Sequence, residues 1–212
     1  MDGDRPDSSG IHFYEPANGH GLRHDPFNAI IAPRPIGWIS TRDGKGNVNL
    51  APSSFFNALN YHPPLIGFSS TGWKDTVANI QETGEFVWKL ATIDIAQAMN
   101  ATSATVAHEV NEFELAGLTA VPSRLVKPPR VGESRVTFEC RLSEIIQLKG
   151  ADGRKAETWL TIGEVVAVHI DKTLNKDGVY QTAQAHPILR AGRMGDYIED
   201  RPDAMFEMVR PK

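Results

Sequence analysis

Two neighbouring runs of the sequence concentrate hydroxyl, amide and aromatic side chains: RPIGWIST at residues 34–41 and NLAPSSFFN at residues 49–57. A third run, KDT at residues 74–76, adds a cation. Aromatic side chains cover flat rings, whereas hydroxyls and an ammonium group bind phosphate oxygens. The mixture therefore suits a ligand that combines a ring with a phosphate tail. The alternative is two ordinary strands whose Ser and Thr side chains face water.

The segment between the first two runs predicts a hairpin. Residues 43–47 read DGKGN, a turn signal, so we expect residues 36–41 to fold back on residues 48–57 as antiparallel strands. Pro33 and Pro35 cannot donate to a strand ladder, which places the chain before residue 36 at an edge or bulge. The hairpin makes the two hydroxyl-rich runs neighbours.

A helix is predicted to begin with Lys74, Asp75 and Thr76 and to end at Gly84. The unpaired N–H groups and the dipole of a helix N-terminus favour a bound phosphate, and a lysine there adds a positive charge that the helix itself disfavours. The alternative is a surface lysine that pairs with Asp75 or Glu82.

Strands outnumber helices in the rest of the chain. We expect strands at residues 65–69 and 85–90, a helix at residues 93–103, and a long antiparallel hairpin of residues 135–148 and 157–170. Residues 106–129 receive no assignment. Short strands with inserted helices favour a mainly β fold, a closed or split antiparallel barrel, over a parallel sheet.

Size and composition indicate one globular domain. The chain has 212 residues, of which 41% are hydrophobic and 23% charged, and a formal net charge of −4. No basic run suggests binding to nucleic acid. Residues 1–10 lack the apolar core of a secretory signal, and no apolar stretch is long enough to span a membrane. We therefore expect a cytoplasmic protein that binds a small molecule.

Several common sites are absent from the sequence. No dinucleotide fingerprint, phosphate-binding glycine loop ending in Lys-Ser or Lys-Thr, or Gly-x-Ser-x-Gly elbow occurs. His20 and His24 have helical spacing, but the glycines around them disfavour a helix, so no metal site is expected. The alternation of the strand places Cys140 on the same face as apolar residues, so it is predicted to be a core residue.

The ordered series of motifs resembles the flavin reductase-like family, which has the FMN-binding split-barrel fold. The runs at residues 34–41, 49–57 and 74–76 carry the resemblance, together with Pro63-Pro64, Asn79-Ile80, TGEFV at 83–87 and HPILRAG at 186–192. The chain is most similar to the branch of flavoredoxins and the reductase component of nitrilotriacetate monooxygenase. We therefore expect a flexible N-terminal tail (residues 1–24), a split-barrel domain (25–200) and a C-terminal tail (201–212).

The resemblance implies FMN held non-covalently at a homodimer interface, with the partner subunit completing each site. The flavin, rather than an acid or base of the protein, supplies the chemistry, so no catalytic residue is assigned. The residues that we expect to contact the ring and ribityl chain are Trp38, Ser40, Thr41, Ser53, Ser54, Phe55 and Asn57. Ser69, Lys74 and Thr76 are expected to bind the phosphate.

The function implied is that of an FMN-binding oxidoreductase, an NAD(P)H-dependent flavin reductase that supplies reduced flavin to a partner oxygenase or another acceptor. One alternative is an FMN-dependent enzyme with its own organic substrate, in which Trp73 and Trp88 shape the pocket. Another is an electron carrier that never meets NAD(P)H. Near the C-terminus, His186, Arg193 and Tyr197 either close over the flavin or contact the partner subunit. The choices of NADH or NADPH, and of FMN or FAD, stay open.

Overall fold

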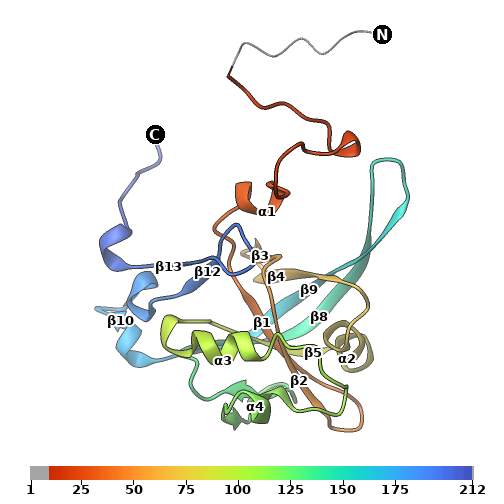
Figure 1. The fold of residues 1–212 in the computed structure, drawn as a ribbon. Helices are drawn as coiled ribbons and strands as arrows, with labels where there is room; N and C mark the ends of the chain where they lie inside the picture. The colour runs from red at the N-terminus through yellow and green to blue at the C-terminus, as the bar shows by residue number, and fades with distance from the viewer. Residues whose placement is uncertain (1–9, 212) are drawn as a thin grey trace, which may run out of the picture.

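One antiparallel sheet organises the protein (Figure 1). The computed structural model describes residues 10–211, and within them this sheet has seven strands in the order β2-β1-β5-β8-β9-β4-β3. In chain order, the strands of the sheet are β1 (Gly37–Arg42), β2 (Val48–Ser53), β3 (Phe56–Asn60), β4 (Leu65–Thr71), β5 (Glu85–Lys89), β8 (Val136–Lys149) and β9 (Lys155–Ile170).

Short elements surround this sheet. The α-helices are α1 (Phe27–Ile30), α2 (Asp75–Thr83), α3 (Ala96–Ala101) and α4 (Glu112–Leu115). Three two-stranded ladders join β6 (Ala120–Val121) to β7 (Arg130–Val131), β10 (Asn175–Lys176) to β11 (Val179–Tyr180), and β12 (Ile188–Arg190) to β13 (Tyr197–Glu199). The 3₁₀ turns are η1 (Pro16–Asn18), η2 (Ile93–Ile95), η3 (Lys172–Leu174), η4 (Thr182–Ala185) and η5 (Pro202–Ala204).

The expected mainly β, antiparallel architecture with inserted helices is confirmed. β1 pairs with β2 from Gly37↔Ser53 to Arg42↔Val48, as the turn signal predicts. α2 ends at Gly84, whose left-handed backbone (φ 73°) lets its N–H return to the carbonyl of Ile80. Of the expected tails, residues 1–9 and residue 212 lie outside the described residues.

The prediction of one strand across residues 48–57 is wrong. β2 ends at Ser53, and after Ser54 and Phe55 the chain starts β3, which pairs with β4 at the other edge of the sheet. The Ser53 hydroxyl donates to the Ser69 carbonyl (3.1 Å), and the Ser69 N–H donates to the Phe55 carbonyl (2.8 Å). The two edges of the curled sheet therefore meet at this crossing.

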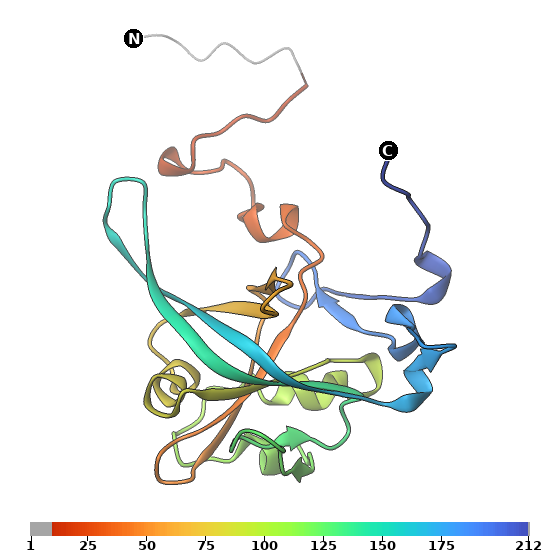
Figure 2. The same ribbon diagram turned by 180° about the vertical axis from the view of Figure 1, so that it is seen from behind.

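The long hairpin predicted from the sequence is formed by β8 and β9, which pair from Val136↔Ile170 to Lys149↔Lys155. Its tip projects beyond the body of the molecule, as both views show (Figures 1 and 2). Within residues 10–211, none of the helices is long and apolar enough to cross a membrane.

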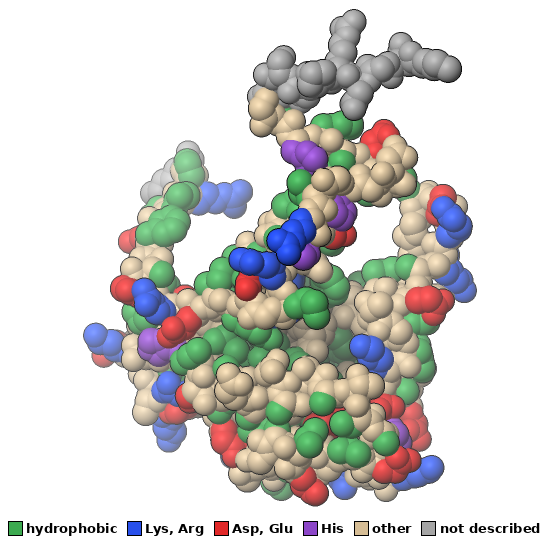
Figure 3. Space-filling view, viewed as in Figure 1, with side chains coloured by type: hydrophobic (Ala, Val, Ile, Leu, Met, Phe, Trp, Pro, Cys, Tyr) green, Lys and Arg blue, Asp and Glu red, His purple; other side chains and the backbone are tan. Residues whose placement is uncertain are grey.

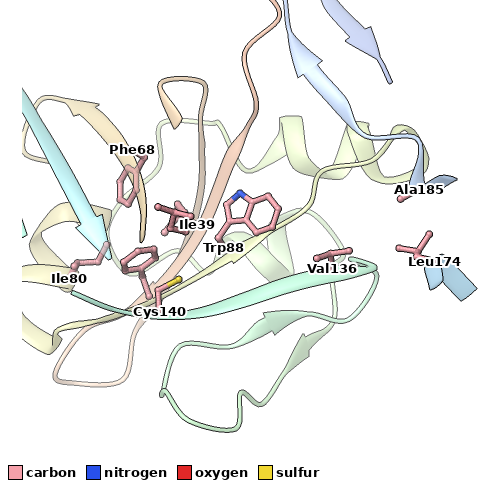
Figure 4. Close-up of a cluster of buried hydrophobic side chains, with 10 residues drawn as sticks. Ile39, Phe68, Ile80, Trp88, Val136, Cys140, Leu174 and Ala185 are labelled. Atoms are coloured by element: carbon pink, nitrogen blue, oxygen red, sulfur yellow. The ribbon is translucent and has the colours of Figure 1, made fainter. Parts of the chain in front are cut away.

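The barrel interior holds the first of two hydrophobic clusters (Figure 4). Ile39 from β1 and Trp88 from β5 meet Cys140 from β8, which is fully buried as predicted. Gly163 is required where β9 crosses the Phe86 ring, because a Cβ atom at this position would lie 2.3 Å from two ring carbons. The interior is therefore filled by side chains and leaves the ligand site to the rim.

The second cluster lies on the outer side of β1 and β2, under α3 and α4. Because side chains alternate along a strand, Trp38 faces this cluster while Ile39 faces the interior. Met99 from α3 and Phe113 from α4 pack beside Trp38 and are almost fully buried. This packing fixes the positions of both ends of the segment that joins α3 to α4.

One buried carboxylate holds residues 124 and 125 in the region left unassigned from the sequence. Glu139 on β8 accepts the N–H groups of Arg124 (2.8 Å) and Leu125 (2.6 Å), and its Oε1 lies 2.6 Å from Nε2 of His169. Burial raises the pKa of Glu139, but these hydrogen bonds outweigh it and lower the pKa. Such a tether carries no hydrophobic periodicity, which is why the sequence pattern did not predict it.

Candidate functional site

A cleft of about 430 Å³ opens beside the crossing where the edges of the sheet meet. Its walls are β2, the last residues of β4, the N-terminus of α2 and the segment that follows α3. β2 is an edge strand, and β4 extends to Thr71, beyond the last residue that pairs with β3. The cleft therefore occupies the split in the barrel.

Five of the ten residues expected to bind a ligand line this cleft: Ser53, Phe55, Ser69, Lys74 and Thr76. They come from β2, the crossing, β4 and α2. The fold thus brings together side chains that are as far apart as residues 53 and 76 in the sequence.

The other five do not line the cleft. Ser54 lies at the crossing, and Asn57 is exposed on β3 with its side-chain oxygen accepting the N–H of Ala58. Trp38, Ser40 and Thr41 are fully buried on β1. Both faces of this strand are covered, so these side chains do not line the cleft, and the expected contacts of the three residues with a ligand, through main chain or side chain, stay a prediction.

Trp38 supports the cleft from behind. Its indole Nε1 donates to the Thr102 hydroxyl (3.0 Å), which in turn donates to the Met99 carbonyl (2.7 Å). Thr102 is a lining residue. The large aromatic side chain of the first sequence run therefore positions a wall of the cleft.

Among the described residues that line the cleft, Lys74 at the N-terminus of α2 is the one lysine or arginine. Lys74 is the N-cap residue and provides no side-chain hydrogen bond to the helix. The first N–H groups of a helix have no partner within the helix. Among the described residues, the Lys74 ammonium has no ion pair or hydrogen bond. The cation and these amides therefore remain free to bind an anion.

The alternative role of Lys74 as a paired surface residue is contradicted by the partners of the nearby acids. Asp75 Oδ1 lies 3.0 Å from His108 Nδ1, and a Glu82 oxygen accepts the N–H of Gly44 (3.1 Å). Neither carboxylate pairs with Lys74 in the part of the chain that the structure describes.

A buried polar network fixes the floor beneath Lys74. The Asn49 amide donates to the hydroxyl of Thr76 (2.9 Å), and the Asn79 amide donates to that of Thr41 (3.1 Å). Asn49 lines the cleft, although the sequence reasoning assigned no site role to it or to Asn79. Both asparagines stand in motifs that carry the family resemblance, and this was the signal that could have identified them. The Thr76 hydroxyl accepts in this network, so its proton is free to donate into the cleft.

Apolar side chains form another part of the lining. Ile39, Pro52, Phe55 and Phe68 contribute carbon surface, and Phe55 is 42% exposed. The guanidinium carbon of Arg34 lies 6.0 Å from the centre of the Phe55 ring. Arg34 is itself held by main-chain carbonyls, including that of Ile31 at 3.0 Å. A flat, partly apolar ligand group would find a supported surface here.

The sequence reasoning missed the wall formed by residues 102–106 and the carboxylate of Glu112. Glu112 is 6% exposed and accepts the N–H of Leu50 (3.0 Å). Burial raises its pKa, while that hydrogen bond opposes the rise. Nothing in the sequence pattern identified this contribution, since it depends on how α3 and α4 pack on β2.

The two tryptophans expected to shape a pocket lie elsewhere. Trp88 is inside the barrel, stacked on Phe56 with ring centres 5.5 Å apart, and donates to the Ile36 carbonyl. Trp73 packs edge-on against Trp159 of the long hairpin. Neither belongs to the cleft lining.

The C-terminal residues are likewise outside the lining. His186 Nδ1 lies 2.7 Å from Glu199, Arg193 pairs with Asp196, and Tyr197 lies under the guanidinium of Arg190. These contacts fold β12 and β13 onto each other and leave the roles of His186, Arg193 and Tyr197 open between flavin and dimer contacts.

The sequence matches the flavin reductase-like domain over residues 31–189. The chain belongs to the flavin reductase-like family. An uncharacterized protein of Halalkalibacterium halodurans is 38% identical over 183 residues, covering 81% of this chain and 87% of the relative. The resemblance inferred from the sequence motifs is confirmed.

Solved structures show the same fold. Nitrilotriacetate monooxygenase component B from Bacillus cereus is 30% identical and superposes with a TM-score of 0.78, covering 100% of this chain and 98% of its own. The 2-nitrobenzoate 2-nitroreductase NbaA of Pseudomonas fluorescens is 25% identical (TM-score 0.76; 87% and 88% covered). The flavoredoxin of Desulfovibrio vulgaris (Miyazaki F), 21% identical (TM-score 0.71; 90% and 97% covered), adds evidence for the fold alone. The split-barrel prediction is confirmed.

Replacing Thr41 by Val tests the buried network. The substitution removes the acceptor of the Asn79 amide and leaves a buried donor unpaired, so we expect the free energy of unfolding to fall by about 1–3 kcal/mol. Chemical denaturation measures this change. Thr161→Val is the matched control, because the Thr161 hydroxyl is buried without a partner among the described residues. Equal losses in the two variants would contradict the importance of the network.

Proposed function

We propose that the cleft binds FMN and that the protein is an NAD(P)H-dependent flavin reductase, which supplies reduced flavin to a partner oxygenase or another acceptor. The observation that carries this proposal is Lys74, which has no partner among the described residues, beside the free N–H groups of α2, in the cleft of a chain from the flavin reductase-like family. One of the similar structures is a component of a monooxygenase, which supports an oxygenase as the partner.

The chemistry of the lining fits the phosphate of FMN. Lys74 supplies a charge, Thr76 a free hydroxyl proton, and α2 its unpaired N–H groups. The Ser69 side chain also lines the cleft and has no hydrogen bond among the described residues. Charge-assisted hydrogen bonds of this kind are the strong ones in protein sites. These groups would hold the phosphate and so fix the position of the cofactor along the cleft.

The remaining lining fits a flat ring. Phe55 and Pro52 offer apolar surface, while Ser53 and the edge of β4 offer polar groups at the rim. A cleft of about 430 Å³ lies within the usual range of small-molecule sites, roughly 300–1,000 Å³. When bound, FMN supplies the hydride and electron chemistry, so the protein's part is to orient the ring and limit access of water.

A homodimer is part of the proposal. The hollowed face in Figure 3 lies between the base of the N-terminal arm and the projecting hairpin. Phe27, Ile30 and Ile31 are each more than half exposed in the chain before β1, and Phe55 is 42% exposed. Exposed apolar patches of this kind mark association surfaces.

Analytical sedimentation of the purified protein is expected to show a dimer. A monomer at all protein concentrations would contradict the proposed homodimer.

A second candidate function is the reduction of an organic substrate by FMN that stays bound. The similarity to 2-nitrobenzoate 2-nitroreductase NbaA favours it, since that protein is named for one organic substrate. The two candidates share the same flavin site and differ in whether the flavin leaves. They are separated by whether added free flavin is turned over.

Lys74→Ala tests the phosphate assignment. The variant removes a charge-assisted contact, so we expect FMN affinity to fall about 10-fold or more while affinity for riboflavin, which has no phosphate, stays unchanged. Titration of flavin fluorescence measures both. Lys155→Ala, an exposed lysine outside the cleft, is the control. Unchanged FMN affinity, or equal losses for both ligands, would contradict the assignment.

Anaerobic reduction tests the activity. The protein loaded with FMN is mixed with NADH or NADPH, and the loss of oxidised flavin absorbance is followed. Rapid bleaching with turnover of added free FMN is the expected result. Bleaching without turnover of free flavin would favour the bound-cofactor enzyme, whereas FMN that binds tightly but is reduced by neither nicotinamide would contradict a nicotinamide-dependent reductase and favour an electron carrier.

A further inference from the structure

One histidine joins the cleft wall to the helix that forms the proposed phosphate site. His108 lies in the segment between α3 and α4, whose residues 102–106 line the cleft. Its Nδ1 lies 3.0 Å from Asp75 Oδ1 in the first turn of α2, and its Nε2 lies 3.2 Å from Asp43 Oδ2 in the β1–β2 turn. In Figure 1, α4 and this turn lie at the lower end of the body, below α2.

This contact is the main attachment of the middle of the segment. Thr102 is anchored by Trp38 at one end, and Asn111 caps α4 at the other. Among the described residues, the hydrogen bonds of residues 103–110 are otherwise internal to the segment or return to α3. The position of the wall between its two ends therefore depends on His108.

The geometry favours a protonated ring. A neutral imidazole carries one N–H, whereas both ring nitrogens of His108 face carboxylates, which only accept. The hydrogen bond to Asp43 and then that to Asp75 raise the pKa of His108. Because the pKa is raised, the doubly donating form persists to a higher pH than in an ordinary histidine and is lost as the pH rises through the raised value.

The charges around this contact explain why it concerns the phosphate. Asp75 lines the cleft beside Lys74, so an uncompensated carboxylate there would repel a bound anion. Glu112 of α4 adds further negative charge that acts on both Asp75 and His108. Glu109, on the same segment, is exposed. His108 is the cation that offsets these acids.

We propose that His108 is a positioning residue of the flavin site: its imidazolium bridges Asp75 and Asp43, neutralises the carboxylate beside the phosphate, and fastens the cleft wall. This role rests on the proposed function and adds a regulatory property to it. Flavin phosphate binding weakens as His108 loses its proton. The bridge itself exists without flavin and is testable alone.

Binding titrations with FMN and riboflavin from about pH 7 to pH 9.5 test the charge role. Above pH 7 the phosphate is already ionised, since its second pKa is about 6. For the natural protein we expect FMN affinity to fall about three- to tenfold as the pH rises through the raised pKa of His108, the size of one nearby unit charge in a water-like medium, while riboflavin affinity changes little.

Variants make this test specific. His108→Gln should bind FMN about three- to tenfold more weakly than the natural protein does below the raised pKa of His108, and should lose the pH dependence, because the compensating charge is gone. Adding Asp75→Asn to it should restore FMN affinity by removing the repulsion. His24→Gln, an exposed histidine outside the cleft, is the control and should behave as the natural protein does.

The outcomes separate the alternatives. If His108→Gln keeps the FMN affinity and pH dependence of the natural protein, the role of His108 is overturned. Equal losses of affinity for FMN and riboflavin would overturn the charge role and leave His108 only the role of holding the cleft wall. NMR titration of the flavin-free protein should give His108 a pKa above the ordinary value for histidine, and a pKa no higher than that would overturn the bridge. A natural protein that binds neither ligand would overturn the proposed function and the phosphate role with it.

Discussion

The crossing of the chain between β2 and β3 is the constraint on which the site depends. Only Ser54 and Phe55 separate a strand at one edge of the sheet from a strand at the other. Such a short connection forces the sheet to curl until its edges meet, and the contacts of Ser53 and Phe55 with Ser69 hold them there. β4 runs on past its pairing with β3, so the barrel stays split where α2 begins. The cleft is the consequence of this closure.

The placement of Lys74 is energetically unfavourable in the absence of a ligand. A cation at a helix N-terminus opposes the helix dipole, by a few tenths of a kcal/mol to about 1 kcal/mol at exposed sites. No neighbouring carboxylate among the described residues compensates it. A buried hydrogen-bond network fixes the start of α2 beneath Lys74, and its members are Asn49, Thr76, Thr41 and Asn79. Such a network is costly unless every buried polar group in it has a partner. Anion binding would account for both features.

The sequence predicted the elements with strong local signals. The DGKGN turn, the capped end of α2 at Gly84 and the alternation around Cys140 each depend on neighbours in the chain, and all were found. Five of the expected ligand-binding residues lie together in the cleft for a similar reason, because locally predicted strands and the start of a predicted helix carry most of them: Ser53, Phe55, Ser69, Lys74 and Thr76.

Predictions failed where long-range packing decides the structure. The strand through residue 57 breaks because β3 pairs across the barrel. Trp38 is buried because α3 and α4 cover it, and its expected contact with a ligand stays a prediction. The wall of residues 102–106 and the His108 bridge likewise depend on tertiary contacts that no local pattern encodes.

A crystal structure of the protein with FMN is the most direct test of the central claim, that the split of the barrel is a flavin site with its phosphate at α2. The account predicts phosphate density within hydrogen-bond distance of Lys74 and Thr76, and the ring beside Phe55. Flavin bound with its phosphate away from α2, or in another part of the molecule, would contradict it.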